Sequence, residues 1–165
     1  MLPWGNNRPT LAKLWNQTSE WPMGKQIFSK ILGQMAPYTG SIGATVLEVS
    51  DGHAVVELRE RRGVRNHLRS IHAIALMNLG EVATGLAVMH SIDGRGRGII
   101  VRLSMDYLKK ARGTITATCD GDVPTEPGKH NVEVIATLRN TDGDAVARAT
   151  ATWKIDIDGD QDAAS

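Results

Sequence analysis

The chain has 165 residues, 41% of them hydrophobic and 22% charged, which suits a single folded domain and excludes an intrinsically disordered chain. Its one cysteine, Cys119, excludes a disulfide framework and a cysteine-rich metal site, so the sequence predicts a cytoplasmic protein without a bound metal. A formal net charge of +1 provides no bulk attraction to nucleic acid or to an anionic membrane, and neither is predicted as a partner.

Residues 1–40 predict a helical extension with two amphipathic helices. Apolar residues recur at helical spacing in two groups, Leu11, Leu14 and Trp15, then Ile27, Phe28, Ile31, Leu32 and Met35. Ser19 is the expected cap of the second helix, and Pro37 with Gly40 its expected end. The first residues lack the basic segment and apolar run of a signal peptide, so export is not predicted.

From Ser41 the hydrophobic period changes to two, which is typical of strands. Asp51-Gly52 separates residues 42–50 from residues 53–60, and this pattern predicts a β-hairpin.

A long apolar helix is predicted over residues 70–90. It nearly reaches the length of a membrane span, but His72, Asn78 and Glu81 interrupt it. Because such polar groups are costly in lipid, we interpret it as a buried core helix and predict no membrane insertion.

Four further strands follow the predicted helix. A glycine-rich turn at residues 93–98 leads to alternating residues 99–107, and residues 115–119 alternate with threonines. The last hairpin turns at Asp142-Gly143. One face of its second strand is small, with alanines at 145, 147, 149 and 151, so we expect something bulky to pack close to it.

Two strands, one very apolar helix and four strands with short connections indicate an α+β domain. An antiparallel sheet needs one face covered, and the predicted helix at residues 70–90 is the element apolar enough to cover it. We therefore expect a curved antiparallel sheet of about six strands around a central helix over residues 41–156, followed by a flexible acidic tail, residues 157–165.

Candidate chemistry concentrates between Asn66 and Glu81. Asn66 and His72 lie near the start of the predicted helix, where free N–H groups and the positive end of the dipole attract a developing negative oxygen. Glu81 lies within the apolar helix and must find a partner or have its pKa raised, which suits a general base. The alternative is structural: Glu81 belongs to a local hydrogen-bond network and His72 only begins the helix.

The steps from Asn66 to His72 and from His72 to Glu81, with the strand at residues 101–107, resemble hotdog-fold acyl-CoA thioesterases of the phenylacetic-acid-degradation type. The sequence is also similar to the poorly characterised branch of that superfamily. The resemblance covers residues 41–156. It implies the hotdog fold, an acyl-CoA or other acyl thioester as substrate, no cofactor beyond the coenzyme A of the substrate, and a homodimer with a continuous sheet that can pair further into a tetramer.

The resemblance also implies roles for four residues. Glu81 matches the acid that acts as base or nucleophile, and Asn66 matches the residue that positions water or substrate. His72 matches the histidine that opens the helix. Ala73 matches the residue whose backbone N–H polarises the thioester carbonyl.

The sequence departs from the family pattern at three points. Ala73 stands where the family has glycine, and Glu81 stands where the subgroup has aspartate. The position of the hydroxyl that some members carry on the next strand aligns with Ile100, so Ser104 is the candidate to substitute for it from another position.

Helix geometry separates His72 from Glu81. Nine residues turn a helix through about 900° and advance it by about 13 Å, so the two side chains project from opposite sides. If both are functional, Asn66, His72 and Ala73 of one subunit face Glu81 of another, and the site is composite.

Arginines flank the helix on both sides, at Arg65 and Arg69 before it and at Arg95 and Arg97 after it. Guanidinium groups suit the phosphates of an acyl-CoA, and we expect these four residues to bind substrate. The alternative is a solvated basic face. RNA binding is disfavoured because no aromatic residues are interleaved with these arginines.

The sequence therefore predicts hydrolysis of an acyl thioester by water, with Glu81 as base. Two alternatives stay open. His67 precedes Glu81 by fourteen residues, similar to the pair of hotdog dehydratases, in which His67 would contact substrate, although the proline-rich loop of that family is missing. The other alternative is a protein that binds acyl thioesters without catalysis.

Overall fold

In the computed structural model, which describes residues 10–159, the short helices come first along the chain and most of the strands last. The helices are α1 (Leu11–Thr18), α2 (Gly24–Met35), α3 (Pro37–Ser41), the short 3-10 helix η1 (Arg62–Val64) and α4 (Ala73–Ser91). The strands are β1 (Thr45–Ser50), β2 (His53–Arg59), β3 (Gly96–Tyr107), β4 (Thr114–Asp120), β5 (Gly128–Arg139) and β6 (Ala145–Ile157).

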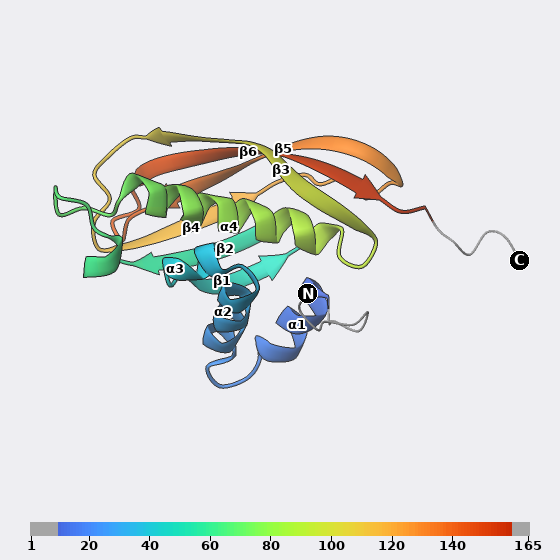
Figure 1. Ribbon diagram of the computed structural model, residues 1–165, viewed down its shortest axis with the longest axis horizontal. Coiled ribbons are helices and arrows are strands. Elements are labelled where there is room, and N and C mark those ends of the chain that lie inside the picture. The colour runs from blue at the N-terminus through green and yellow to red at the C-terminus, as the bar shows by residue number, and fades with distance from the viewer. Residues whose placement is uncertain (1–9, 160–165) are drawn as a thin grey trace, which may run out of the picture.

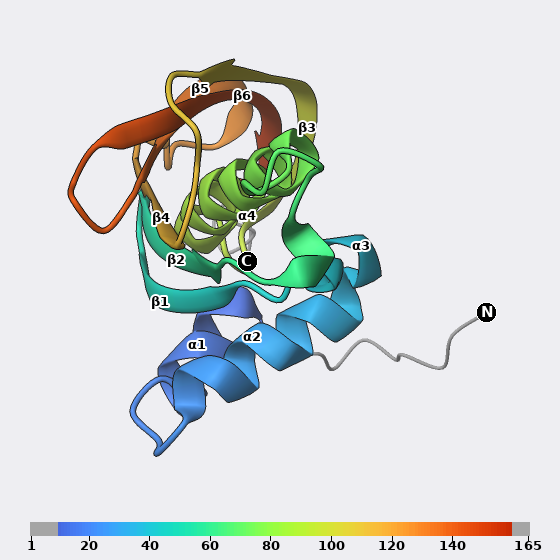
Figure 2. The same ribbon diagram turned by 90° about the vertical axis from the view of Figure 1, so that its left-hand side faces the viewer.

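The strands form one sheet in the order β1-β2-β4-β5-β6-β3, and every neighbouring pair is antiparallel. The sheet curves around α4, and the N-terminal helices lie beside β1 (Figures 1 and 2). The predicted architecture of six antiparallel strands around a long central helix is thus confirmed. The strand after α4, β3, lies at an edge of the sheet.

Helix α4 is the centre of the core. Leu79, Ala83 and Val88 are fully buried, and strands contact the helix along its length. By length and composition α4 is also a candidate membrane span, but 61% of its apolar window is buried within the fold. The sheet thus supplies the apolar surroundings that the helix needs.

The backbone of α4 approaches β6 closely where both carry small residues. A Cβ atom on Gly80 would lie 2.5 Å from the Cβ of Ala149, and one on Gly85 would lie 3.3 Å from the Trp153 ring. The alanine face of β6 therefore receives the backbone of α4, and the helix is the bulky element that packs close to this face.

The N-terminal helices join the same core. The rings of Trp15 and Phe28 meet edge to face with centroids 5.0 Å apart, and Phe28 is fully buried. The amide of Val46 in β1 donates a hydrogen bond to Ser29 Oγ of α2 (2.8 Å). This contact fixes α2 on the edge strand.

The ends of the first helices agree only in part with the expected ones. Ser19 closes α1 instead of capping α2, which begins after Met23 in a left-handed conformation (φ 60°). Helix α2 ends at Met35 with Ala36 as its C-cap, just before Pro37 as expected. Pro37 also begins α3, where its missing N–H leaves no bond unmade.

Tertiary contacts move three other boundaries. Helix α4 begins at Ala73, because the amides of Ile71 and His72 donate to the carbonyls of Ala111 and Val64. Strand β3 includes Gly96, which was expected in the turn; a Cβ there would lie 2.5 Å from a β6 carbonyl oxygen. Strand β6 continues to Ile157. Residues 1–9 of the expected extension and 160–165 of the expected tail lie outside the described residues.

We expect Gly80→Ala to destabilise the protein, although alanine is the better helix former by roughly 1 kcal/mol. Its methyl group would overlap Ala149, and overpacking of this kind lowers the free energy of unfolding by about 1–3 kcal/mol. Urea denaturation measures this loss, and the compensating change Ala149→Gly, tested alone and in combination, should recover part of it. Additive losses in the double variant would contradict the proposed contact.

Candidate active site

The loop before α4 is organised by one side chain, Asn66. Its Oδ1 accepts hydrogen bonds from the Leu68 amide (2.9 Å), the Ser70 amide (3.2 Å) and the Ser70 hydroxyl (3.2 Å). An asparagine oxygen has no further lone pair to offer after this set. The Nδ2 group is therefore the part of Asn66 that can serve a ligand, as a donor.

His72 is the N-cap of α4. Its Nδ1 accepts a hydrogen bond from the Ile74 amide (3.1 Å), so the neutral ring carries its proton on Nε2. The next residue, Ala73, is half-buried, and among residues 10–159 its N–H has no hydrogen-bond acceptor. This N–H lies at the positive end of a helix of 19 residues and can stabilise a negative oxygen.

Tyr107 connects the end of β3 to the start of α4. Its hydroxyl donates a hydrogen bond to the Ala73 carbonyl (3.0 Å), and partial burial raises the pKa of the phenol above its ordinary value. The phenol therefore stays protonated at neutral pH and keeps the first turn of α4 in place.

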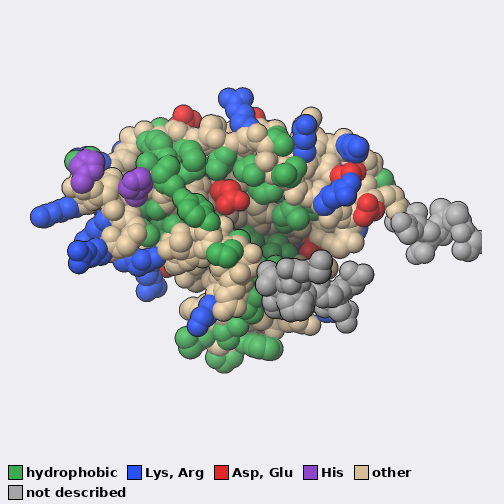
Figure 3. Space-filling model, viewed as in Figure 1, with side chains coloured by type: hydrophobic (Ala, Val, Ile, Leu, Met, Phe, Trp, Pro, Cys, Tyr) green, Lys and Arg blue, Asp and Glu red, His purple; other side chains and the backbone are tan. Residues whose placement is uncertain are grey.

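Glu81 occupies a different position, near the middle of α4. It lines a cavity of about 180 Å³ together with residues of α1, α2, α3, α4 and β6: Leu11, Leu32, Ala36, Thr39, Val82, Gly85, Leu86, Met89 and Trp153. Figure 3 shows a hydrophobic surface in the region of α4 that encloses a small acidic patch.

The surroundings of Glu81 disfavour its charge. Among residues 10–159 its carboxylate has no hydrogen-bond or salt-bridge partner, and burial raises its pKa above the ordinary 4.5. A carboxylate of this kind binds a proton more readily than a solvated one, as a general base must. Beside it, the indole N–H of Trp153 is buried and has no acceptor among the described residues.

Asn66, His72 and Ala73 lie together at the start of α4, but Glu81 does not join them in the same chain. Eight residues of helix separate Ala73 from Glu81, which corresponds to about 12 Å along the axis. The arrangement within one chain is therefore two half-sites: donors at the helix N-terminus, and a carboxylate in an apolar cavity.

The four predicted arginines do not form one cluster within a chain. Arg65 and Arg69 precede α4, whereas Arg95 and Arg97 follow its other end, about 28 Å away along the axis. Arg65 is bound to Glu60, Arg95 donates to the Ser91 carbonyl (2.8 Å), and Arg97 pairs with Asp156 (3.0 Å). Of the four arginines, Arg69 is the one whose side chain forms no hydrogen bond or salt bridge within residues 10–159.

His67 and Ser104 also lie away from Glu81. His67 is exposed in the loop before α4. The Ser104 hydroxyl donates to the Thr150 carbonyl (3.4 Å), while the next residue, Met105, approaches Gly80 of α4. Because successive strand residues face opposite sides, Ser104 points away from the helix that carries Glu81 of its own chain.

Other catalytic groups are disfavoured in the described part of the chain. Burial, with a smaller effect of Asp120, raises the pKa of Cys119 to about 12, so a thiolate nucleophile does not form at neutral pH. Within residues 10–159 no group of three His, Cys, Asp or Glu side chains could hold a metal ion.

Sequence reasoning missed the walls around Glu81. Leu32, Thr39 and Trp153 are each more than 40 positions from Glu81 along the chain. No spacing in the sequence therefore connects them to Glu81. The one available signal was the apolar stripe of the second predicted helix.

Comparison with known proteins places this architecture among related ones. A family model described as a domain of unknown function (DUF4442) matches residues 24–155. A search of curated proteins finds no match. A structural-genomics protein, APC5556, is 31% identical, with a TM-score of 0.77 over 89% of this chain and 98% of its own.

Two similar structures carry functional descriptions. A probable thioesterase of Pseudomonas aeruginosa is 20% identical, with a TM-score of 0.70 over 83% of this chain and 97% of its own. A mutant of the phenylacetic acid degradation protein PaaI from Thermus thermophilus is 21% identical, with a TM-score of 0.62 over 72% of this chain and 97% of its own. At these identities the likeness shows the fold, and it confirms the predicted hotdog fold.

We expect Glu81→Gln to stabilise the protein at alkaline pH. Because burial raises the pKa of Glu81, the folded state holds this proton more tightly than the unfolded chain does. The resulting stability is present below about pH 4.5 and is lost as the pH rises through the folded-state pKa. The amide variant has no such loss, so its advantage in urea denaturation should be large at about pH 8 and vanish near pH 4. A difference that does not vary with pH would contradict this account.

Proposed function

The chain belongs to the DUF4442 family and has the hotdog fold, and on this premise we propose that it hydrolyses acyl thioesters such as acyl-CoA. The observation that carries the proposal is the half-buried carboxylate of Glu81, which has no partner among residues 10–159 and lies in an apolar cavity on the central helix. The likeness to a probable thioesterase and to PaaI supports the reaction class.

In the proposed reaction, water attacks the thioester carbon while Glu81 removes a proton from that water. The carbonyl oxygen becomes an oxyanion, for which the free Ala73 N–H and the Nδ2 group of Asn66 are suitable donors. When the tetrahedral intermediate collapses, the carbon–sulfur bond breaks and the proton passes from Glu81 to the leaving thiolate. The products are a carboxylic acid and the free thiol.

A dimer would bring these groups together. Strand β3 lies at the sheet edge, is 12 residues long and carries exposed Ile99 and Val101. An apolar edge strand of this length needs a partner, and pairing with the same strand of a second copy supplies one with two-fold symmetry. The same axis reverses the direction of α4, so the donors at the start of one α4 can face Glu81 of the other subunit.

The dimer also gives the arginines a common role. With the two α4 helices reversed, Arg95 and Arg97 at the end of one helix approach the side of Arg65 and Arg69 of the other. We infer that the phosphates of coenzyme A are bound there, and of these four residues Arg69 is the candidate without a contact among the described residues.

Replacement of the base tests the reaction. We expect Glu81→Gln to lower kcat for acyl-CoA hydrolysis by about 10²- to 10⁴-fold, because the amide keeps the shape and cannot accept the proton. Thiol release from a panel of acyl-CoAs measures the effect. Glu133→Gln, at an exposed position of β5, is the matched control and should leave turnover unchanged.

Turnover of Glu81→Gln equal to that of the unmodified protein would refute the role of Glu81. Hydration of an enoyl-CoA without thiol release would identify the protein as a hydratase. Binding of acyl-CoA with neither reaction would identify it as a binding protein.

Mixed dimers test the shared site. Asn66→Asp keeps the Oδ1 acceptor that organises the loop and removes the Nδ2 donor. We expect this variant and Glu81→Gln each to be inactive as pure proteins. When the two variants are unfolded together and refolded, half of the dimers are mixed, and each mixed dimer has one site without a defect. About one quarter of all sites should then be active.

A site built within one chain would keep one defect everywhere and recover no activity. Native mass spectrometry confirms that mixed dimers have formed, and light scattering checks that the protein is a dimer at all.

A further inference from the structure

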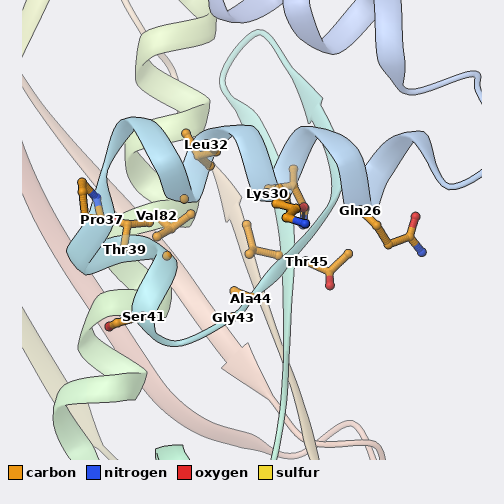
Figure 4. A pocket seen from close by; sticks show the side chains of 15 residues that line it. Gln26, Lys30, Leu32, Pro37, Thr39, Ser41, Gly43, Ala44, Thr45 and Val82 are labelled. Carbon is orange, nitrogen blue, oxygen red and sulfur yellow. Dashed lines mark hydrogen bonds between the residues drawn. The ribbon is translucent and has the colours of Figure 1, made fainter. Parts of the chain in front are cut away.

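The N-terminal helices cover β1 and α4 without filling the space between them. A cavity of about 540 Å³ remains under α2 and α3, within the range of about 300–1,000 Å³ that is usual for small-molecule sites. We call it the hairpin cavity. Its walls come from α2, α3, the start of β1, Val56 of β2 and Val82 of α4 (Figure 4).

The hairpin cavity adjoins the smaller cavity that contains Glu81. Leu32, Thr39 and Val82 line both of them. In Figure 4 these three side chains gather at the end where α4 passes, whereas Gln26 lies at the opposite end. Val82 follows Glu81 directly in the chain, so the wall that the two cavities share lies one residue from the candidate base.

The walls of the hairpin cavity are mostly uncharged. Among the described residues its apolar members are Leu32, Pro37, Ala44, Val46, Val56 and Val82, and its uncharged polar members are Gln26, Ser29, Thr39, Ser41 and Thr45. The one charged residue in this lining is Lys30, whose side chain is exposed to solvent. Because no carboxylate is among these residues, the cavity favours an uncharged aliphatic ligand over a charged one.

The cavity is built by specific contacts around it. Gly33 and Gly40 bring α2 and α3 together so closely that a Cβ on Gly40 would lie 2.6 Å from the Gly33 oxygen. The Val46 amide donates to Ser29 Oγ (2.8 Å), and Asn78 Nδ2 donates to the Tyr38 carbonyl (3.1 Å). These bonds fix α2 on β1 and α3 on α4, so the space is present before a ligand arrives.

We propose that the hairpin cavity binds the acyl chain of the substrate, and that this chain is an aliphatic one long enough to extend beyond the cavity at Glu81. The inference rests on the proposed thioester hydrolysis, because attack by water that Glu81 activates requires the thioester carbon at Glu81. The acyl chain begins at that carbon, and the adjoining apolar space is the hairpin cavity. The cavity at Glu81 has about 180 Å³ and the hairpin cavity about 540 Å³, so a long acyl chain needs the space beyond the shared residues Leu32, Thr39 and Val82.

The test is the dependence of kcat/KM on chain length. Each methylene that enters an apolar cavity strengthens binding by about fourfold, so kcat/KM should rise by about that factor per methylene from acetyl-CoA onward until the cavity is full. Thr39→Phe adds bulk where the two cavities adjoin and should lower the ratio of kcat/KM for decanoyl-CoA to that for acetyl-CoA by about 100-fold. Gln34→Phe adds the same ring at an exposed position of α2 outside the lining and should leave that ratio unchanged.

A second variant acts in the opposite direction. Leu32→Ala removes bulk from the wall that the two cavities share and should shift the preference toward longer or branched acyl groups. Unchanged chain-length profiles in both Thr39→Phe and Leu32→Ala, with hydrolysis intact, would overturn the assignment of the hairpin cavity and leave the proposed function standing.

A binding measurement separates the two proposals. The probe is a thioether analogue of decanoyl-CoA, which cannot be hydrolysed, and calorimetry reports its affinity. If no acyl-CoA is hydrolysed, the proposed function fails; loss of analogue binding in Thr39→Phe but not in Gln34→Phe still supports the hairpin cavity as an acyl site. Absence of analogue binding to the unmodified protein, or equal binding by both variants, would overturn it.

Discussion

The close packing of α4 against β6 is the constraint on which the rest of the structure depends. Gly80 and Ala149 allow the helix backbone to approach the sheet, and no larger pair of residues would fit at this separation. A helix held this close is covered by strands on most of its circumference, which accounts for its lack of a polar face. The curvature of the sheet and the burial of α4 are therefore two aspects of one packing arrangement.

This arrangement leaves a single stripe of α4 incompletely covered. The stripe contains Ile74, Met77, Glu81, Gly85 and Met89, which recur at three- and four-residue intervals. Glu81 is its one charged member, and its charge is disfavoured there because burial raises its pKa. An arrangement that lowers stability at neutral pH and serves no packing purpose is typical of a functional site.

The N-terminal helices determine what surrounds this stripe. They add walls to the cavity of Glu81 and create the hairpin cavity beside it, so the sheet and α4 alone would present an open surface. Two buried polar atoms in this region, Asn78 Oδ1 and Trp153 Nε1, have no partner among residues 10–159. Buried polar groups are usually satisfied, and unsatisfied ones gathered near a cavity are consistent with a ligand or a second subunit that completes the region.

The sequence by itself determined the six strands, the central helix, the first two helices and the enclosing sheet, but not α3 or η1. Alternation of apolar residues identified the strands, and Asp51-Gly52 and Asp142-Gly143 identified the hairpins. The long apolar segment at residues 70–90 contains polar residues that are costly in lipid, and this combination identified the core helix. The sequence also singled out Glu81, because a carboxylate within an apolar helix must find a partner or have its pKa raised. These features depend on short-range periodicity and backbone geometry, which the order of residues specifies directly.

Only the tertiary structure decided what each candidate residue touches. Asn66 was expected to bind water or substrate, but its Oδ1 accepts hydrogen bonds from Leu68 and Ser70 of the same loop. Only its amide nitrogen is therefore available to a ligand. The arginines, adjacent to the helix ends in sequence, are separated by the full length of α4, and Ser104 faces the other side of the sheet. Thr39 and Trp153 reach Glu81 from distant parts of the chain. Such contacts depend on how elements pack in three dimensions, and residue spacing along the chain does not encode the distance between side chains on different elements.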